Sequence, residues 1–411
     1  MTRVVQDTAA VPSSMPRLGR LMAAYSGAQL VLAVCVTGAM QVMLPNQIAE
    51  VAGEHKVAVF GLVTGVGAVA NMIAQPVSGA LSDRTATRFG RRMPWLVGGA
   101  AGGLVALAVL GSATTVLWIA VCWGLMQLCV GAMTAPLSAV VPDGAPVEKR
   151  GLVSALGGIG MFVGALAGVA VAAAFGERLP TGYLTLGGLL AVGCALCAAL
   201  AGERPGTRSA GAGLQWRLPH VADHPDFAWA FLARFLIVLG YQALLSYLRY
   251  ILSDYIGLSV SEANAAMPTL AAVVTIAVLA GLLPVAILSD RMGRRKVFVV
   301  VASLVIAGSA AIPLVWPTLN GLYVSLAIAG LGIGGYAGVD QALMTQVLPR
   351  AEDSGRDLGL LNIANNGAQV LAPLAASLVI AFCGGYPVLY ASAIVLAVLG
   401  AVAIVPIKSV R

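Results

Sequence analysis

GALSDRTATRFGRRMPWL, at residues 79–96, returns in shortened form as LSDRMGRRK at residues 288–296. Each copy follows a long apolar segment and carries Asp, Arg, Gly and paired basic residues. Asp83 and Asp290 are 207 positions apart, and Pro142 and Pro349, which each follow another apolar segment, are separated by the same interval. The chain is therefore a tandem repeat whose unit is a set of apolar segments joined by short basic loops, as expected of two duplicated membrane bundles.

The composition is that of a membrane protein. Hydrophobic residues make up 59% of the 411 residues and charged residues only 10%, whereas a soluble domain averages about 25% charged residues. The apolar segments are long and lack the alternation of an outer-membrane barrel, so we expect helices, which satisfy their own backbone hydrogen bonds in lipid. The sequence thus predicts an all-α membrane protein.

Counting about 20 apolar residues per crossing, we predict twelve transmembrane helices in two pseudo-symmetric bundles of six. The first bundle, residues 21–201, has spans at 21–44, 57–81, 94–111, 115–141, 152–175 and 182–201. The second, residues 228–407, has spans at 228–252, 263–288, 297–316, 321–347, 358–382 and 386–407. Residues 1–20 and 408–411 are predicted tails, and residues 202–227 are the predicted linker between the bundles.

The basic residues predict the orientation. If both ends of the chain lie on one side, the tails, the linker and the loops after spans two, four, eight and ten hold 20 of the 24 Lys and Arg residues. Only Lys56 and Arg178 fall in loops on the other side. Since Lys and Arg concentrate on the cytoplasmic side, we expect a multi-pass protein of the cell (inner) membrane with both termini cytoplasmic. The net charge of +7 then reflects contact with anionic lipid, and no nucleic-acid partner is needed to explain it.

Few side chains suit redox, metal or nucleotide chemistry. All three histidines lie outside the predicted spans, and the six cysteines lie within or at the edges of spans, where Cys commonly packs as a small hydrophobic residue. No G-x-x-x-x-G-K-[ST] loop occurs, so ATP is not the expected energy source. We predict no disulfide, no metal and no cofactor, with a proton, or sodium in its place, as the coupling ion.

The two loops resemble the signature of the major facilitator superfamily, G-x-L-x-D-R-x-G-R-R. The first copy fits once four extra residues are allowed, and the second has the unextended spacing. The matching residues are Gly79, Leu81, Asp83, Arg84, Gly90, Arg91 and Arg92 in the first copy and Leu288, Asp290, Arg291, Gly293, Arg294 and Arg295 in the second. The extended form at residues 82–94 is similar to the glycoside-pentoside-hexuronide cation symporters and the proton-coupled sucrose transporters. The resemblance implies two six-helix bundles around a cavity lined by spans one, four, seven and ten, and we expect a monomer in the bilayer.

The same resemblance implies that the loop residues, apart from the two leucines, form a conformational latch of the outward-facing state. Physical chemistry favours this too, because an Asp at a helix end beside Arg makes charge-assisted bonds that one conformation forms and another breaks. The alternative is that the arginines merely anchor the topology.

Few charged residues lie inside predicted spans, where charge is costly and therefore points to function. Asp340 lies nine residues before Pro349, about 13 Å inside the predicted cytoplasmic boundary, and Arg234 lies eight residues after Asp226, at about 12 Å. We predict that the two side chains pair across the cavity, and that protonation of Asp340 or arrival of substrate changes the pair. A permanent structural ion pair is the alternative.

Polar and aromatic side chains in the spans are candidates for binding the substrate. Tyr25 and Gln29 share one face of span one, and Trp123 and Gln127 share one face of span four. The other candidates are Tyr241, Gln242 and Tyr336 in spans seven and ten, and Asn362 and Asn366 in span eleven. Rings beside amides suit a sugar but also an amphipathic drug, and packing is the alternative role of each residue. The amides of span eleven, Asn365 and Gln369 included, can equally bind neighbouring helices.

These features predict a secondary active transporter that moves a small organic solute by alternating access. Proton-coupled sugar or glycoside symport is the first hypothesis, and proton-driven export of a drug or secondary metabolite is the alternative. Span five has Gly160, Gly164 and Gly168 but no proline, whereas the superfamily's drug–proton antiporters usually have a Gly-Pro element there. An enzyme is not expected, because spans with one acid and no histidine offer no catalytic cluster. A solute sensor without transport is a more remote alternative.

Overall fold

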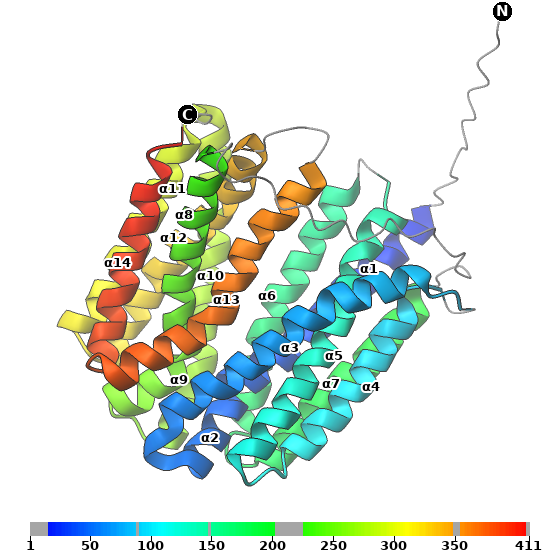
Figure 1. Cartoon of the computed structure of the whole chain (residues 1–411), viewed down its shortest axis with the longest axis horizontal. Helices are drawn as coiled ribbons and strands as arrows, with labels where there is room; N and C mark the ends of the chain where they lie inside the picture. Colours follow the sequence, from blue (N-terminus) through cyan, green and yellow to red (C-terminus); the bar gives the residue numbers. More distant parts are fainter. Residues whose placement is uncertain (1–14, 88–89, 147–148, 202–224, 348–353, 408–411) are drawn as a thin grey trace, which may run out of the picture.

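The computed structural model describes residues 15–87, 90–146, 149–201, 225–347 and 354–407, and within these ranges it is helical without a β-strand. Eleven helical stretches of the described residues are long and apolar enough to cross a membrane. The first, Leu18–Arg84, has 67 residues and folds back at Gly53–His55, so it crosses twice. The predicted all-α fold is confirmed, with twelve crossings in two bundles (Figure 1). The predicted linker, residues 202–227, lies outside the described residues except for its last three.

In the N-terminal half, the first crossing consists of α1 (Met15–Gly38), a π-helical turn η1 (Ala39–Met43) and α2 (Leu44–Ala52). After the turn η2 (Gly53–His55) follow α3 (Lys56–Arg84), α4 (Met93–Leu110), α5 (Val116–Gly144), α6 (Arg150–Ala174) and α7 (Leu179–Ala201). The first crossing begins at Met15 and ends at Ala52, beyond both predicted boundaries. Pro45 explains the π-helical turn before it, since its ring removes one N–H and crowds the preceding carbonyl groups.

The C-terminal half repeats this order. Its first crossing is α8 (Pro225–Ser246), α9 (Leu248–Tyr250) and a π-helical turn η5 (Ile251–Tyr255), with an interruption at Tyr247. It is followed by α10 (Val260–Met292), α11 (Arg295–Val315), α12 (Leu319–Val347), α13 (Ser354–Phe382) and α14 (Tyr386–Ile404). A capping box of Ser259 and Glu262 starts α10, and Gly293 ends it with a left-handed φ of 60°.

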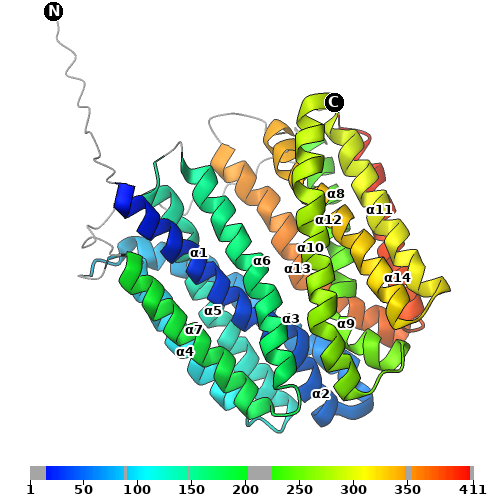
Figure 2. The same cartoon turned by 180° about the vertical axis from the view of Figure 1, so that it is seen from behind.

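The packing of the helices shows the duplication. In the N-terminal half α1 packs on α6 and α7, α3 on α5, and α4 on α5 and α7. The C-terminal half has the corresponding contacts of α8 with α13 and α14, α10 with α12, and α11 with α12 and α14. The two halves meet along two seams, α3 with α13 in Figure 1 and α6 with α10 in Figure 2.

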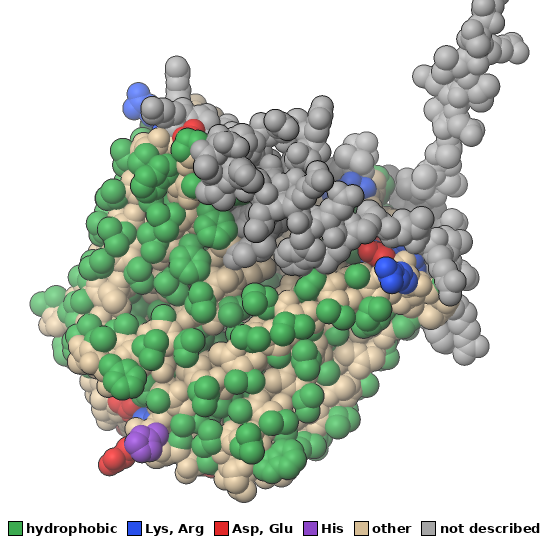
Figure 3. All heavy atoms as spheres, viewed as in Figure 1, with side chains coloured by type: hydrophobic (Ala, Val, Ile, Leu, Met, Phe, Trp, Pro, Cys, Tyr) green, Lys and Arg blue, Asp and Glu red, His purple; other side chains and the backbone are tan. Residues whose placement is uncertain are grey.

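The surface agrees with a position in lipid. On the face shown in Figure 3, hydrophobic side chains cover the middle of the molecule, and charged side chains lie toward its ends. Exposed apolar residues such as Leu62, Val105 and Ile276 are 55%, 63% and 66% accessible, which water would not favour over such an area. We call the end with Arg84, Arg91 and Arg291 the basic end, and the end with η2 and η5 the opposite end.

Small residues set the closest helix contact in the N-terminal half. A Cβ atom added to Gly160, Gly164 or Gly168 of α6 would lie 2.4, 2.2 or 2.2 Å from a backbone oxygen of α1, far inside van der Waals contact. The stripe that the sequence shows every four residues is therefore the surface on which α1 packs, as small residues permit in membranes.

Replacing Gly164 with valine should destabilise the folded protein by roughly 1–3 kcal/mol, because the added carbons overlap the Leu30 carbonyl and force the helices apart. Thermal unfolding of the purified protein measures the effect as a lower Tm. Gly158→Val on the same helix is the control, since a Cβ there meets nothing within 4 Å. Equal Tm values for the two variants would contradict this account of the α1–α6 contact.

Candidate functional site

A buried ion pair lies inside the C-terminal half. Nε of Arg234, on α8, is 3.3 Å from Oδ2 of Asp340, on α12, and the two side chains are 9% and 6% exposed. The structure thus brings together the two charges whose depths match in the sequence, although both helices belong to the same half.

The pair has polar neighbours but few good hydrogen bonds. The Tyr336 hydroxyl faces Asp340, and the charges of Asp340 and Arg234 both act on Tyr241. Neither Nε of Arg234 nor the Tyr336 hydroxyl makes a hydrogen bond of good geometry with another described residue. Buried polar groups normally have such partners, so the hydrogen-bonding capacity of this cluster is only partly used among the described residues.

The substrate candidates Tyr25 and Gln29 lie on α1, in the N-terminal half. Tyr25 lines a small pocket with Met93, Leu137 and Cys197, and its ring fills the space beside Gly157. Gln29 donates a hydrogen bond to its hydroxyl at 3.3 Å. These positions suit packing, and a substrate role for Tyr25 and Gln29 stays a prediction.

Trp123 and Gln127 of α5 both pack against Gly67 of α3. Trp123 is 1% exposed, and its Nε1 atom has no hydrogen-bond partner among the described residues. Gln127 is half-buried. An unpaired indole N–H is a donor that a ligand could use, although no pocket opens on it here.

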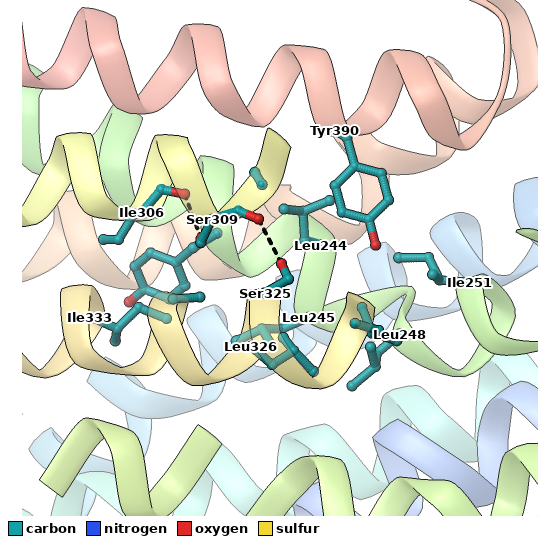
Figure 4. A pocket seen from close by; sticks show the side chains of 14 residues that line it. Leu244, Leu245, Leu248, Ile251, Ile306, Ser309, Ser325, Leu326, Ile333 and Tyr390 are labelled. Atoms are coloured by element: carbon teal, nitrogen blue, oxygen red, sulfur yellow. Dashed lines mark hydrogen bonds between the residues drawn. The ribbon is translucent and has the colours of Figure 1, made fainter. Parts of the chain in front are cut away.

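In the C-terminal half an apolar pocket lies between α8, α11, α12 and α14 (Figure 4). Tyr241 and Tyr390 line it, and Ser325 donates to the Ser309 carbonyl at 2.7 Å across it. This pocket lies within one half, so Tyr241 does not face the seam. The neighbouring candidate Gln242 is half-buried.

Span eleven is described only in part. The side chain of Asn362 lies outside the described residues, whereas Asn366 is exposed and accepts a hydrogen bond of 3.4 Å from Asn365. Gln369 is exposed as well. The structure therefore leaves both roles of these amides, lining a cavity and binding neighbouring helices, as predictions.

The first signature loop forms a compact network at the basic end. Arg92 is 6% exposed and lies 2.8 Å from Asp83, 3.0 Å from Asp143 and 2.5 Å from the Ser82 hydroxyl. Arg91 also binds Asp143, at 2.8 Å. Gly90 has a φ of 96°, which a side chain would disfavour. The loop thus ties the ends of α3 and α5 to the start of α4 within one half, with Gly79 against Ala135 of α5 and Arg84 exposed.

The second loop is looser. Arg295 pairs with Asp290 at 2.9 Å, but that Asp side chain is 67% exposed. Arg291 and Arg294 are exposed, and Gly293 provides the left-handed turn. Lys296 binds the Ile407 carbonyl, which fixes the end of α14.

A polar clasp joins the two halves at the opposite end. Lys56 of α3 pairs with Asp254 of η5 at 2.7 Å, and Tyr386 of α14 donates to the same carboxylate at 2.8 Å. Tyr250 donates to the Pro45 carbonyl at 2.9 Å, and Tyr247 to the Val57 carbonyl at 3.0 Å. Among the described residues, hydrogen bonds and ion pairs between the halves occur only at this end.

Beneath the clasp lies a buried arginine. Nε of Arg249, on α9, donates to Oδ1 of Asn264, on α10, at 2.8 Å. Nδ2 of Asn46, on α2, donates to the same oxygen at 3.0 Å from the other half. The three side chains are each 4% exposed. Phe60 of α3 stacks edge-on against Tyr247 and Tyr250 beside this group.

The sequence profile of the Major Facilitator Superfamily matches residues 29–273 and, for the second half, 230–410. The chain belongs to the Major Facilitator Superfamily. Membership makes it a multi-pass membrane transporter rather than an enzyme. No curated protein matches the sequence significantly.

Solved structures of other superfamily transporters have the same fold. A bacterial homolog of the human lysosomal transporter Spinster, in an inward-facing and unoccupied conformation, has a TM-score of 0.67 at 16% identity, covering 95% of both chains. The nucleoside transporter NupG gives 0.74 at 12% identity over 94% of this chain and 99% of its own. A D-xylose–proton symporter gives 0.69 at 15% identity over 95% and 97%. At these identities the likeness shows the fold alone.

The residues of the clasp and those beneath it are not among the candidates that the sequence predicts. Arg249 falls within the predicted span 228–252, so the rule that selected Arg234 applies to it as well. Asp143 follows the proline that ends span four, beside the basic loop that it binds. Asn46 and Asn264 are 218 positions apart, and only the fold shows that they meet.

We expect the clasp to hold the transporter closed at the opposite end. Lys56→Glu should favour opening there by about 0.5–1 kcal/mol, the worth of a partly exposed pair, and so change the open population roughly two- to fivefold. Spin labels on the exposed residues Glu54 and Val260, in a Cys383→Ser background, report the distance between the halves.

The double variant Lys56→Glu, Asp254→Lys restores opposite charges and serves as the control. It should return the distance distribution toward that of the parent. An unchanged distribution in the single variant would contradict a role for the ion pair in closure.

Proposed function

We propose that this transporter couples movement of a small organic solute, a sugar or glycoside in the first instance, to movement of protons by alternating access. The observation that carries the proposal is the buried pair of Arg234 and Asp340. Protonation has its largest energetic effect on a carboxylate that is buried beside an arginine. The protonated carboxyl leaves the arginine cation without its partner in a medium of low dielectric constant.

The position of the pair within one half supports this role. A rocking motion of two rigid halves leaves the distance between α8 and α12 unchanged, so motion alone does not separate the two charges. Protonation does, since a neutral carboxyl no longer attracts the guanidinium group. Tyr336 and Tyr241 beside the pair offer hydroxyl groups to the freed side chains.

The proposal assigns this structure to the inward-facing state. With both termini and the basic end in the cytoplasm of a cell membrane, as the positive-inside rule favours, the clasp closes the external side. Among the described residues, the latch residue Asp83 bonds to Arg92 within its own half, and no bond joins it to the described part of the C-terminal half. This is the arrangement expected of a latch that has been released.

Proton-driven export of a drug or secondary metabolite remains the alternative for the direction and the substrate. The same ion pair serves import and export. The proton neutralises the same carboxylate whether it moves in the same direction as the solute or in the opposite direction. Tyr25 and Trp123 pack inside the N-terminal half. These two rings therefore give little support to a sugar as the substrate.

Replacing Asp340 with asparagine should abolish proton-driven accumulation but preserve exchange. Asparagine mimics the protonated carboxyl, so the loaded carrier can still reorient, but it binds no proton. In proteoliposomes with a gradient of about one pH unit, worth about 1.4 kcal/mol per proton, the parent should concentrate its solute up to about tenfold and the variant not at all.

Glu177→Gln, which removes an exposed carboxylate at the opposite end, is the control for lost charge. Solutes are first screened by thermal stabilisation, using sugars, glycosides and amphipathic drugs, because only ligands that bind the folded state raise Tm. Accumulation by the Asp340→Asn variant at the parental level would place the coupling residue elsewhere.

A further inference from the structure

Arg249 is a buried cation without a carboxylate partner. Its side chain lies about 10 Å inside the opposite end, counting seven residues of helix from Ile256. It is 4% exposed, and none of the ion pairs among the described residues includes it. Its bonds go to the Asn264 amide at 2.8 Å and to the Val260 carbonyl at 3.4 Å, both neutral groups. A buried charge held only by neutral groups is costly.

The group has more hydrogen-bond donors than acceptors. Arg249 carries five N–H bonds, and only two of its nitrogens have partners among the described residues. Nδ2 of Asn264, which is buried, has none. A single oxygen, Oδ1 of Asn264, receives both Arg249 and Asn46. Oδ1 of Asn46 is a buried acceptor that also has no partner, but it belongs to the other half. The part of the group that lies in the C-terminal half therefore lacks an acceptor, and a carboxylate supplies two acceptor oxygens and a negative charge.

The local charges point the same way. Asp254 is the nearest acid that acts on Arg249, and it is already bound by Lys56 and Tyr386. One carboxylate therefore faces two cations. The glutamates of this end, Glu50, Glu54, Glu177 and Glu262, are exposed, so water and salt screen their charges. A net positive charge remains buried at the seam.

We propose that Arg249 and Nδ2 of Asn264 form a recognition site for a carboxylate on the transported solute, so that the substrate is an organic acid, such as a sugar acid, rather than a neutral sugar. The inference rests on the proposed transport function but not on its coupling to protons. Both residues belong to the C-terminal half, so they stay together when the halves separate.

Opening of the clasp makes this site available. Asn46 belongs to the other half and leaves Asn264 when the opposite end opens, which exposes Arg249 to solvent at the mouth of the seam. An anion that binds there accepts hydrogen bonds from N–H groups of Arg249 and Asn264 that lack acceptors in the closed state. Asn46 then acts as a competitor of the solute, because its amide uses the face of Asn264 that opening uncovers.

Matched pairs of neutral and acidic compounds test the proposal. The panel is D-glucose with D-glucuronate, D-galactose with D-galacturonate, methyl glucoside with methyl glucuronide, and 1,2-propanediol with lactate. Thermal unfolding of the purified protein against ligand concentration gives an apparent Kd for each. We expect at least one acid to raise Tm while its neutral counterpart does not, and Arg249→Gln to weaken that acid about tenfold or more, the loss expected for a hydrogen bond to a charged group.

Three variants separate recognition from a merely structural role. Arg178→Gln removes an exposed arginine from the same end and should leave the affinity unchanged. Asn46→Ala breaks the bond between the halves but keeps both donors, so the acid should bind as well as before or more tightly. If Arg249→Gln fails to fold, Asn264→Ala removes one donor and keeps the charge, and should still weaken the acid.

The proposal is wrong if no acid of the panel stabilises the parent, if a neutral compound binds as tightly as its acid, or if Arg249→Gln binds the acid like the parent. The binding measurement is made at equilibrium without a pH gradient, so its outcome does not depend on the proton hypothesis, which the accumulation assay tests separately.

Discussion

A charge that lies between the two ends of this bundle must have a partner, because an isolated ion in hydrocarbon costs several kcal/mol. This constraint explains most of the structure. Nearly all charged residues lie at the ends, and the buried exceptions are few. Arg234 is neutralised by Asp340 inside one half, whereas Arg249 is held by amides at the junction of both halves. The packing of the interior must therefore provide partners for Arg234 and Arg249.

The duplication is close in architecture but unequal in chemistry. In the first half, Asp143 receives both arginines of the signature loop. The position 207 residues later is Arg350, which replaces the acceptor by another cation. Among the described residues, the second loop has the pair of Asp290 and Arg295, whose carboxylate is largely exposed. In the described part of the chain, the larger network of the two loops therefore lies in the N-terminal half.

The fold could be predicted from the sequence because hydropathy and the positions of basic residues determine crossings. The similar depths of Arg234 and Asp340 in their spans also predicted that the two side chains pair. The orientation of each helix about its axis was beyond reach, since spacing shows which residues share a face but not what that face meets. Tyr25 and Trp123, for example, pack against the glycines Gly157 and Gly67 of neighbouring helices. The meeting of Asn46 and Asn264 depends on two π-helical turns and on contacts between halves, which no local pattern encodes.

The seventh crossing carries both arginines, 15 residues apart in sequence, with Arg234 on α8 and Arg249 on α9 beyond the interruption at Tyr247. They differ in what releases them. The partner of Arg234 is in its own half, so relative motion of the halves does not break that pair and a change of protonation does. The group around Arg249 includes Asn46 from the other half, so motion changes it directly. Both arginines lie on one crossing of the C-terminal half, with the interruption at Tyr247 between them, so the level proposed to respond to protons and the level that responds to opening belong to the same half.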